Sequence, residues 1–132
     1  MSFSRIPDFD GSFREPDPVP AAAAGIGMAL VSWLHLAPTS VQSMAPWLHK
    51  GCMALLGNSS TVLAVIFYCA WLAHLGEACY ALVLLQRKNC LRSNTALPWF
   101  ISTFLFGYPS LKNLIKDVRG YRTPKMPNKR SD

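Results

Sequence analysis

Three long apolar blocks, separated by shorter polar segments, set the pattern of this 132-residue chain. The longest covers residues 62–85, VLAVIFYCAWLAHLGEACYALVLL, and two ionisable side chains, His74 and Glu77, lie near its middle. At about 1.5 Å rise per residue, a helix over this block extends roughly 36 Å, enough to cross a hydrocarbon core of about 30 Å. The pattern predicts a membrane-spanning helix with a polar pair close to mid-membrane.

Two further apolar blocks predict two more spans. Residues 21–37 follow a proline suited to the first turn of a helix, and they stop before Pro38. Residues 96–115 contain Gly107 and Pro109, and because Pro109 removes a backbone donor, we expect a helix break there that kinks the third span. Residues 44–57 carry an apolar run too short to cross, which predicts a helix lying in the membrane interface.

Together these elements predict an all-α fold: an integral membrane helical bundle of three transmembrane helices and a short interfacial helix, within residues 21–116. Residues 1–20 are acidic and contain four prolines, with stray phenylalanines. So little apolar area cannot offset the entropy of ordering, which predicts a flexible arm. Residues 117–132 are basic and interrupted by proline, which predicts a disordered tail.

A helical wheel divides the 62–85 helix into two faces. Because helices in lipid associate through close packing, a face of small residues predicts contact with another helix, and the bulky apolar face predicts contact with acyl chains. On this wheel His74 and Glu77 point into protein. The small and polar face gathers Cys69, Ala70, Ala73, His74, Gly76, Glu77, Tyr80 and Ala81.

Charge is distributed unevenly, although the formal net charge is +6. Residues 1–19 sum to −2, whereas the chain from Lys112 onward sums to +5. A basic tail beside a span is typical of proteins that meet anionic lipid, and no nucleic-acid-binding motif accompanies it. With three spans, five basic residues share a side with the N-terminus and eight with the C-terminus, which favours a cytoplasmic C-terminus. The start lacks the layout of a signal peptide or presequence, so an endoplasmic reticulum or a mitochondrial membrane stays open.

The second and third blocks carry a spaced set of residues built on a His-x-Gly-Glu core. In these residues the chain resembles the transmembrane protein 254 family, small multi-span proteins built around a domain of unknown function. The resemblance covers about the C-terminal half and implies a multi-span topology without an established reaction. Its residues are Trp71, Leu72, His74, Gly76, Glu77, Tyr80 and Ala81, then Trp99, Phe100, Thr103, Phe104, Phe106, Gly107, Ser110 and Leu111.

His74 and Glu77 are three residues apart, so they are neighbours on a helix surface. A charged side chain at mid-helix costs about 2.5–3.5 kcal/mol on insertion scales, which makes the pair a candidate site. In the structural interpretation, hydrogen bonds from the pair fix the bundle, and the protein is a non-enzymatic accessory or assembly subunit. Its partners would be membrane lipid and other membrane proteins, or further copies of itself. The supporting polar or packing residues would be Gly76, Tyr80, Thr103 and Ser110.

Two other interpretations stay open. The pair could relay protons or hold the polar end of a lipid, which would make this a small lipid- or proton-handling membrane protein. Alternatively, His74 could hold haem with His35, or a metal with Glu77 and Cys79. Cys79 lies on another side of the helical wheel from the pair, and His35 lies at another depth in the membrane. No complete set of ligands can therefore form, and we expect neither metal nor cofactor. No Ser/His/Asp constellation can be placed, so we do not expect an enzyme.

Overall fold

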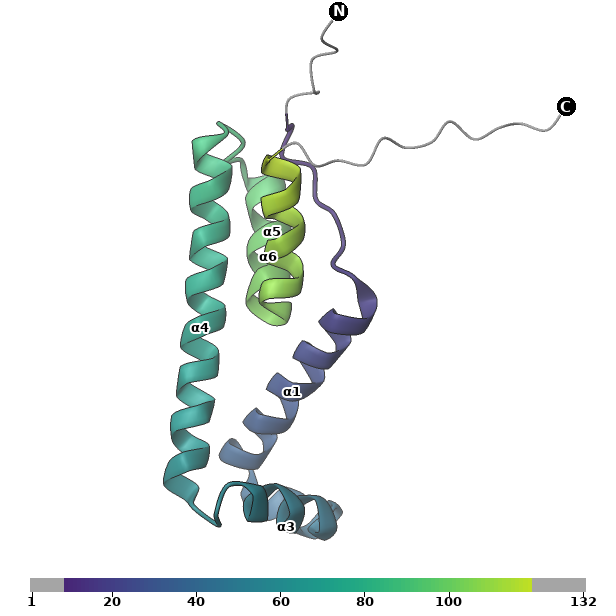
Figure 1. Cartoon of the computed structure of the whole chain (residues 1–132), viewed down its shortest axis with the longest axis vertical. Helices are drawn as coiled ribbons and strands as arrows, with labels where there is room; N and C mark the ends of the chain where they lie inside the picture. Colours follow the sequence, from purple (N-terminus) through teal and green to yellow (C-terminus); the bar gives the residue numbers. More distant parts are fainter. Residues whose placement is uncertain (1–8, 120–132) are drawn as a thin grey trace, which may run out of the picture.

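The computed structural model describes residues 9–119, and within this range the chain is all-helical (Figure 1). The longest helix, α4, has 28 residues and forms the axis of the molecule. The helices are α1 (Pro18–Leu36), α2 (Pro38–Met44), α3 (Pro46–Leu55), α4 (Ser60–Arg87), α5 (Ser93–Phe106) and α6 (Tyr108–Val118).

Proline sets two of the helix boundaries. Ala37 and Ala45 each precede a proline and have φ near −140°, outside the helical region. Each alanine therefore ends one helix, and the proline that follows starts the next, where its missing N–H is not needed. The short helix expected over 44–57 is present as α3, which occupies most of that range, and α2 precedes it without having been predicted.

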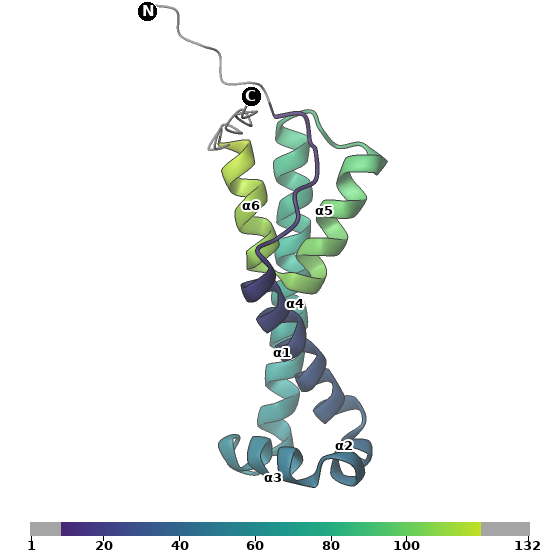
Figure 2. The same cartoon turned by 90° about the vertical axis from the view of Figure 1, so that its right-hand side faces the viewer.

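The other helices pack along α4 in two groups (Figures 1 and 2). α1 contacts the N-terminal half of α4 at an angle, and α2 and α3 lie across the end where α1 stops and α4 starts. α5 and α6 pack on the C-terminal half of α4. Both ends of the described chain, together with the turn after α4, therefore lie at the end opposite α2 and α3.

Two helices, α1 and α4, are long and apolar enough to cross a membrane. Only 11% of the apolar window of each is buried, so neither is the enclosed core helix of a globular protein. Large apolar side chains stay exposed along both, which lipid but not water would favour. The helices expected over 21–37 and 62–85 are thus present as α1 and α4, and both are candidate membrane spans.

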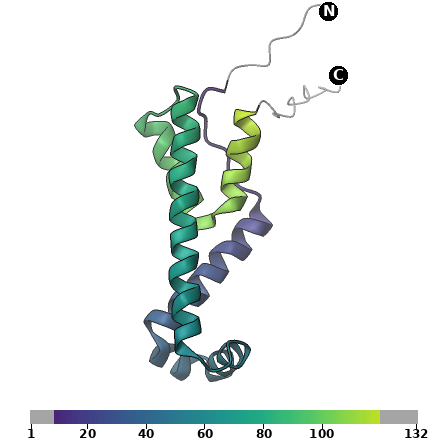
Figure 3. The same ribbon diagram turned by 60° about the vertical axis from the view of Figure 1, so that its left-hand side comes forward.

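The expected third span over 96–115 is wrong, because the chain reverses direction inside it. α5 ends at Phe106 and α6 starts at Tyr108, and the two helices pack against each other as a hairpin (Figure 3). Gly107 between them has φ 64° and ψ −134°. At 14 and 11 residues, the helices extend roughly 21 and 16 Å, so neither can cross a core of about 30 Å. The break is a reversal and not a kink.

Two apolar clusters hold this arrangement together. One joins α4 to both arms of the hairpin through buried Leu85, Trp99 and Leu114. The other, around buried Leu34, Val41 and Leu63, joins the end of α1 to α2 and to the start of α4. The hairpin and α1 are thus fastened to opposite halves of α4.

Candidate functional site

The His74/Glu77 pair lies at the middle of α4, beside the point where the α5–α6 hairpin turns. Nδ1 of His74 donates a hydrogen bond to the carbonyl oxygen of Phe104, at 2.8 Å. In a continuous helix this carbonyl would accept from residue 108, but the chain has reversed before that residue. His74 therefore supplies a donor to a carbonyl that the break in the hairpin leaves without its helical partner.

Glu77 lies against the turn itself. A Cβ atom built on Gly107 would stand 2.8 Å from Oε2 of Glu77 and 3.0 Å from Cε1 of His74. The carboxylate also lies at the N-terminal end of α6, where the helix dipole favours negative charge. The two polar side chains thus lie close to the backbone of Gly107, which has no side chain of its own and is buried between them.

Thr103 and Ser110 form a second polar cluster, inside the hairpin. The hydroxyl of Ser110 donates to Oγ of Ser102 at 2.9 Å, and Oγ1 of Thr103 lies 3.5 Å from Oγ of Ser110. All three residues are buried, where solvent does not supply hydrogen-bond partners for their hydroxyl groups. These bonds therefore join α5 to α6. Ser102 was not predicted from the sequence, although a hydroxyl group eight residues before Ser110 indicates a possible hydrogen-bond partner once a hairpin is assumed.

The structure does not bring Gly76 and Tyr80 to the pair. Both are exposed on the outer side of α4, and nothing lies within 4 Å of a Cβ built on Gly76. The packed face of α4 is instead centred on His74, with buried Ala78 and Ala81. The expected small-residue face is therefore rotated: His74, Glu77 and Ala81 face protein, whereas Gly76 and Tyr80 are exposed.

α1 reaches the same region from the other side. Nε1 of Trp71 donates to Oγ of Ser32 at 3.1 Å, which joins α4 to α1. The Trp71 ring also lies 5.2 Å from the ring of Phe104, centroid to centroid. Further along, Gly25 of α1 lies against the ring of Phe106, the last residue of α5. The pair therefore sits where α1, α4 and the hairpin meet.

The arm before α1 is docked on the hairpin, contrary to the expectation of a flexible segment over 1–20; residues 1–8 lie outside the described range. Nε1 of Trp99 donates to the carbonyl of Gly11 at 3.2 Å, and the Phe13 ring packs edge-on against Trp99. Nδ2 of Asn113 donates to the carbonyl of Glu15 at 3.0 Å. Side chains of α5 and α6 therefore bind the backbone of the arm, a pattern that leaves little trace in the arm's own sequence.

One ion pair accompanies this docked arm. Nη1 of Arg14 lies 3.6 Å from Oδ1 of Asp117, whose side chain is fully buried and makes no hydrogen bond within the described residues. Asp117 belongs to α6 and not to a disordered tail, so the predicted boundary at 117 falls within a helix. The rest of the expected tail, from residue 120, lies outside the described range.

The residues considered for a cofactor stand apart from the pair. His35 stacks on the Phe67 ring, at 4.5 Å between centroids, two turns nearer the start of α4 than His74. Cys79 is exposed on α4. Across residues 9–119, no three His, Cys, Asp or Glu side chains converge as metal ligands would.

Comparison with known proteins decides the relationship. The family model described as transmembrane protein 254 matches residues 20–116, from the start of α1 to near the end of α6. This chain belongs to the transmembrane protein 254 family. It is 38% identical over 91 residues to "Transmembrane protein 254" of Rattus norvegicus, which covers 67% of this chain and 73% of the rat protein.

Other members of the transmembrane protein 254 family match over a similar range. The Mus musculus protein is 38% identical over 92 residues, covering 68% of this chain and 74% of its own length. The Homo sapiens protein is 36% identical over 86 residues, covering 64% and 69%. No solved structure matches the chain. The family match spans α1 through the hairpin, so the elements around His74 and Glu77 all lie within it.

Proposed function

We propose that this chain is an integral membrane protein without enzymatic activity, an accessory or assembly subunit in which His74 and Glu77 fasten the α5–α6 hairpin to α4. The hydrogen bond from His74 to Phe104 carries the proposal. In a membrane, backbone that leaves its helix must find partners within the protein, because lipid offers none. The pair lies midway along the 28-residue α4, where that requirement is strictest.

The surroundings of the pair support a structural role over a relay. The imidazole of His74 donates to a backbone carbonyl of the hairpin, and the carboxyl group of Glu77 lies beside the Gly107 turn. Both groups therefore face the hairpin. The hairpin in turn contacts α1 through Phe106. Fixing the turn therefore fixes the relative positions of all the long helices, which is what a scaffold for larger assemblies requires.

Substitutions of Glu77 test this role. Glu77→Gln keeps the size and most of the hydrogen-bonding capacity, so we expect the free energy of unfolding in mild detergent to stay within about 1 kcal/mol of wild type. Glu77→Leu removes the carboxyl group beside the turn and leaves His74 as its polar neighbour on α4, and we expect a loss of roughly 1–3 kcal/mol. Proteins that co-purify with the wild type should be retained by Glu77→Gln and lost by Glu77→Leu. Equal loss in both variants would favour proton handling, in which the ionised carboxyl is essential.

We also infer that the end carrying both described chain termini faces the cytoplasm. The hairpin brings the end of α6 back beside the turn after α4, so the charge comparison made for three spans no longer holds. At the opposite end, on α2 and α3, the described basic residue is Lys50. At the end that carries both described chain termini, the basic residues are Arg14, Arg87, Lys88, Arg92, Lys116 and Arg119. Such an excess is typical of the cytoplasmic side.

Single cysteines in a background without native cysteines test this orientation. After the plasma membrane alone is permeabilised, we expect a membrane-impermeant maleimide to label Ser93→Cys and Lys116→Cys but not Ser43→Cys. Ser43→Cys on α2 should react only when detergent opens all membranes. If Lys116→Cys and Ser93→Cys were labelled from opposite sides, the chain would cross a third time and the hairpin would be refuted.

A further inference from the structure

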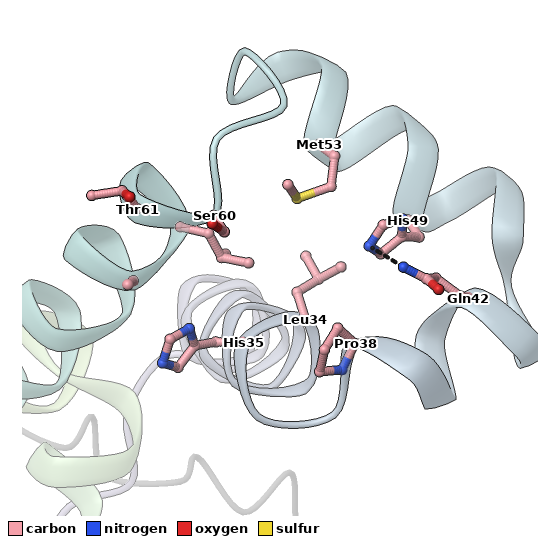
Figure 4. A pocket seen from close by; sticks show the side chains of 10 residues that line it. Leu34, His35, Pro38, Gln42, His49, Met53, Ser60 and Thr61 are labelled. Atoms are coloured by element: carbon pink, nitrogen blue, oxygen red, sulfur yellow. Dashed lines mark hydrogen bonds between the residues drawn. The ribbon is translucent and has the colours of Figure 1, made fainter.

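A cavity of about 610 Å³ lies at the end of the molecule opposite the hairpin (Figure 4). Four helices line it: the end of α1, α2, α3 and the first turn of α4. Its polar side chains are His35, Gln42, His49, Ser60 and Thr61, and Leu34 projects into it from α1. The His74/Glu77 pair does not line this cavity, whose nearest lining residue on α4, Ala64, comes ten residues before His74.

Most of the polar groups around the cavity are hydrogen-bond donors or can become donors. Nε2 of Gln42 lies 3.3 Å from Nε2 of His49, and an amide nitrogen donates in such a contact, which leaves Nδ1 as the donor of the His49 ring. The His35 ring is held by stacking on Phe67 and makes no hydrogen bond within the described residues. Ser60 and Thr61 add hydroxyl groups in the first turn of α4, where the N–H of Val62 already donates to Oγ of Ser59.

The charge of this end suits an anion. Between Asp17 and Glu77 the sequence contains no acidic residue, whereas Lys50 follows His49 directly on α3. A negatively charged group in the cavity would therefore meet two imidazoles, with no carboxylate to repel it and with Lys50 one residue beyond the lining His49. Phosphate is the anion for which such mixed N–H and O–H donors are suited.

The position of the cavity on α1 and α4 points to a lipid as the source of that phosphate. The cavity lies where these two candidate spans end and begin, which is the level of the headgroups in a bilayer that both helices cross. The crosswise helices beside it expose Met44 (72%), Trp47 (75%) and Leu55 (89%), apolar side chains typical of helices embedded in the interface. The same cavity is also lined by apolar side chains of α1 and α4, namely Leu34, Leu63 and Ala64.

We propose that this cavity binds the phosphodiester headgroup of a membrane glycerophospholipid, with the acyl chains lying along α1 and α4. His35, His49 and the hydroxyl groups of Ser60 and Thr61 contact the phosphate, and the apolar wall contacts the glycerol and the first methylenes. The proposal rests on the membrane placement of α1 and α4 given above, but not on the role of His74 and Glu77. A failure of the Glu77 experiment would leave it intact.

Photolabelling of the full chain in dodecyl maltoside tests the proposal. The probe is a phosphatidylcholine with a diazirine in its headgroup, and adducts are mapped by mass spectrometry. We expect adducts to concentrate in residues 34–64, and unlabelled phosphatidylcholine to compete for them while phosphate-free diacylglycerol does not. Adducts spread evenly over all lipid-facing helices would show bulk lipid contact and overturn the proposal. Equal competition by inorganic phosphate would assign the site to a soluble anion and overturn the lipid headgroup as occupant.

Substitutions in the cavity separate recognition from folding. His35→Phe keeps the ring stacked on Phe67 but removes its N–H, and His49→Leu removes the second imidazole. We expect each to raise the concentration of phosphatidylcholine needed for half-competition about tenfold, and Thr61→Val to do so less strongly. Gln86→Leu, at the other end of α4, is the matched control and should change nothing. Unchanged competition in both histidine variants, with wild-type helicity, would overturn the assignment.

Discussion

Replacing Gly107 with alanine should lower the free energy of unfolding by roughly 2–4 kcal/mol. Two costs add in this variant. The backbone at Gly107 has φ 64° and ψ −134°, a combination that a residue with a Cβ atom rarely adopts. The new Cβ atom would also stand 2.8 Å from Oε2 of Glu77 and 3.1 Å from Nε2 of His74, so the pair would have to move. Unfolding in detergent, followed by circular dichroism, measures the effect.

Gly76→Ala on α4 is the matched control for this substitution. Gly76 is helical, and nothing lies within 4 Å of the Cβ that alanine would add. Because alanine has the higher helix propensity, we expect the control to be neutral or up to about 1 kcal/mol more stable than wild type. If Gly107→Ala were as stable as Gly76→Ala, the turn would not be confined between His74 and Glu77 as the structure has it.

The second large effect is expected at Trp99. This side chain is fully buried in the cluster between α4, α5 and α6, and its Nε1 donates to the carbonyl of Gly11. Trp99→Ala would leave a cavity and a buried carbonyl without its donor, at a cost of roughly 3–5 kcal/mol. It would also release the docked arm, so tryptic cleavage after Arg14 in detergent should accelerate together with the loss of stability.

Trp47→Ala provides the comparison for Trp99→Ala. Trp47 is 75% exposed on α3, and its loss should change the free energy of unfolding in detergent by no more than about 0.5 kcal/mol. Cleavage after Arg14 should keep its wild-type rate in this control. A Trp99→Ala protein that kept both its stability and its resistance to cleavage would show that the arm is not held through the Trp99 ring.

Local signals were sufficient for three of the helices. The apolar blocks locate α1 and α4 and the short apolar run over 44–57 locates α3, whereas α2 was not predicted from such signals. They failed over 96–115 because hydropathy measures only whether a stretch is apolar. A kinked span and a hairpin have the same composition, and the difference lies in whether Ser110 and Leu114 find partners on α5 and α4.

The candidate site could likewise be predicted from the sequence only in part. His74 and Glu77 stand out because an ionisable pair in an apolar helix is costly, and that cost is visible in the sequence. Their partners are a backbone carbonyl at Phe104 and a turn at Gly107, thirty residues later. Backbone acceptors carry no residue-type signal. The partners predicted from the sequence were therefore side chains, among them Tyr80, which is exposed.

By itself the sequence determined that this protein is helical, that the blocks over 21–37 and 62–85 form long apolar helices, and that a polar pair lies midway along the longer one. Only the tertiary structure decided that the last apolar block turns back on itself, that the pair faces this turn, and that the arm before α1 is docked. The physical reason is that periodicity and hydropathy report how each segment meets its solvent. Which backbone groups need partners depends on where the chain reverses, and that is settled by packing between segments far apart in sequence.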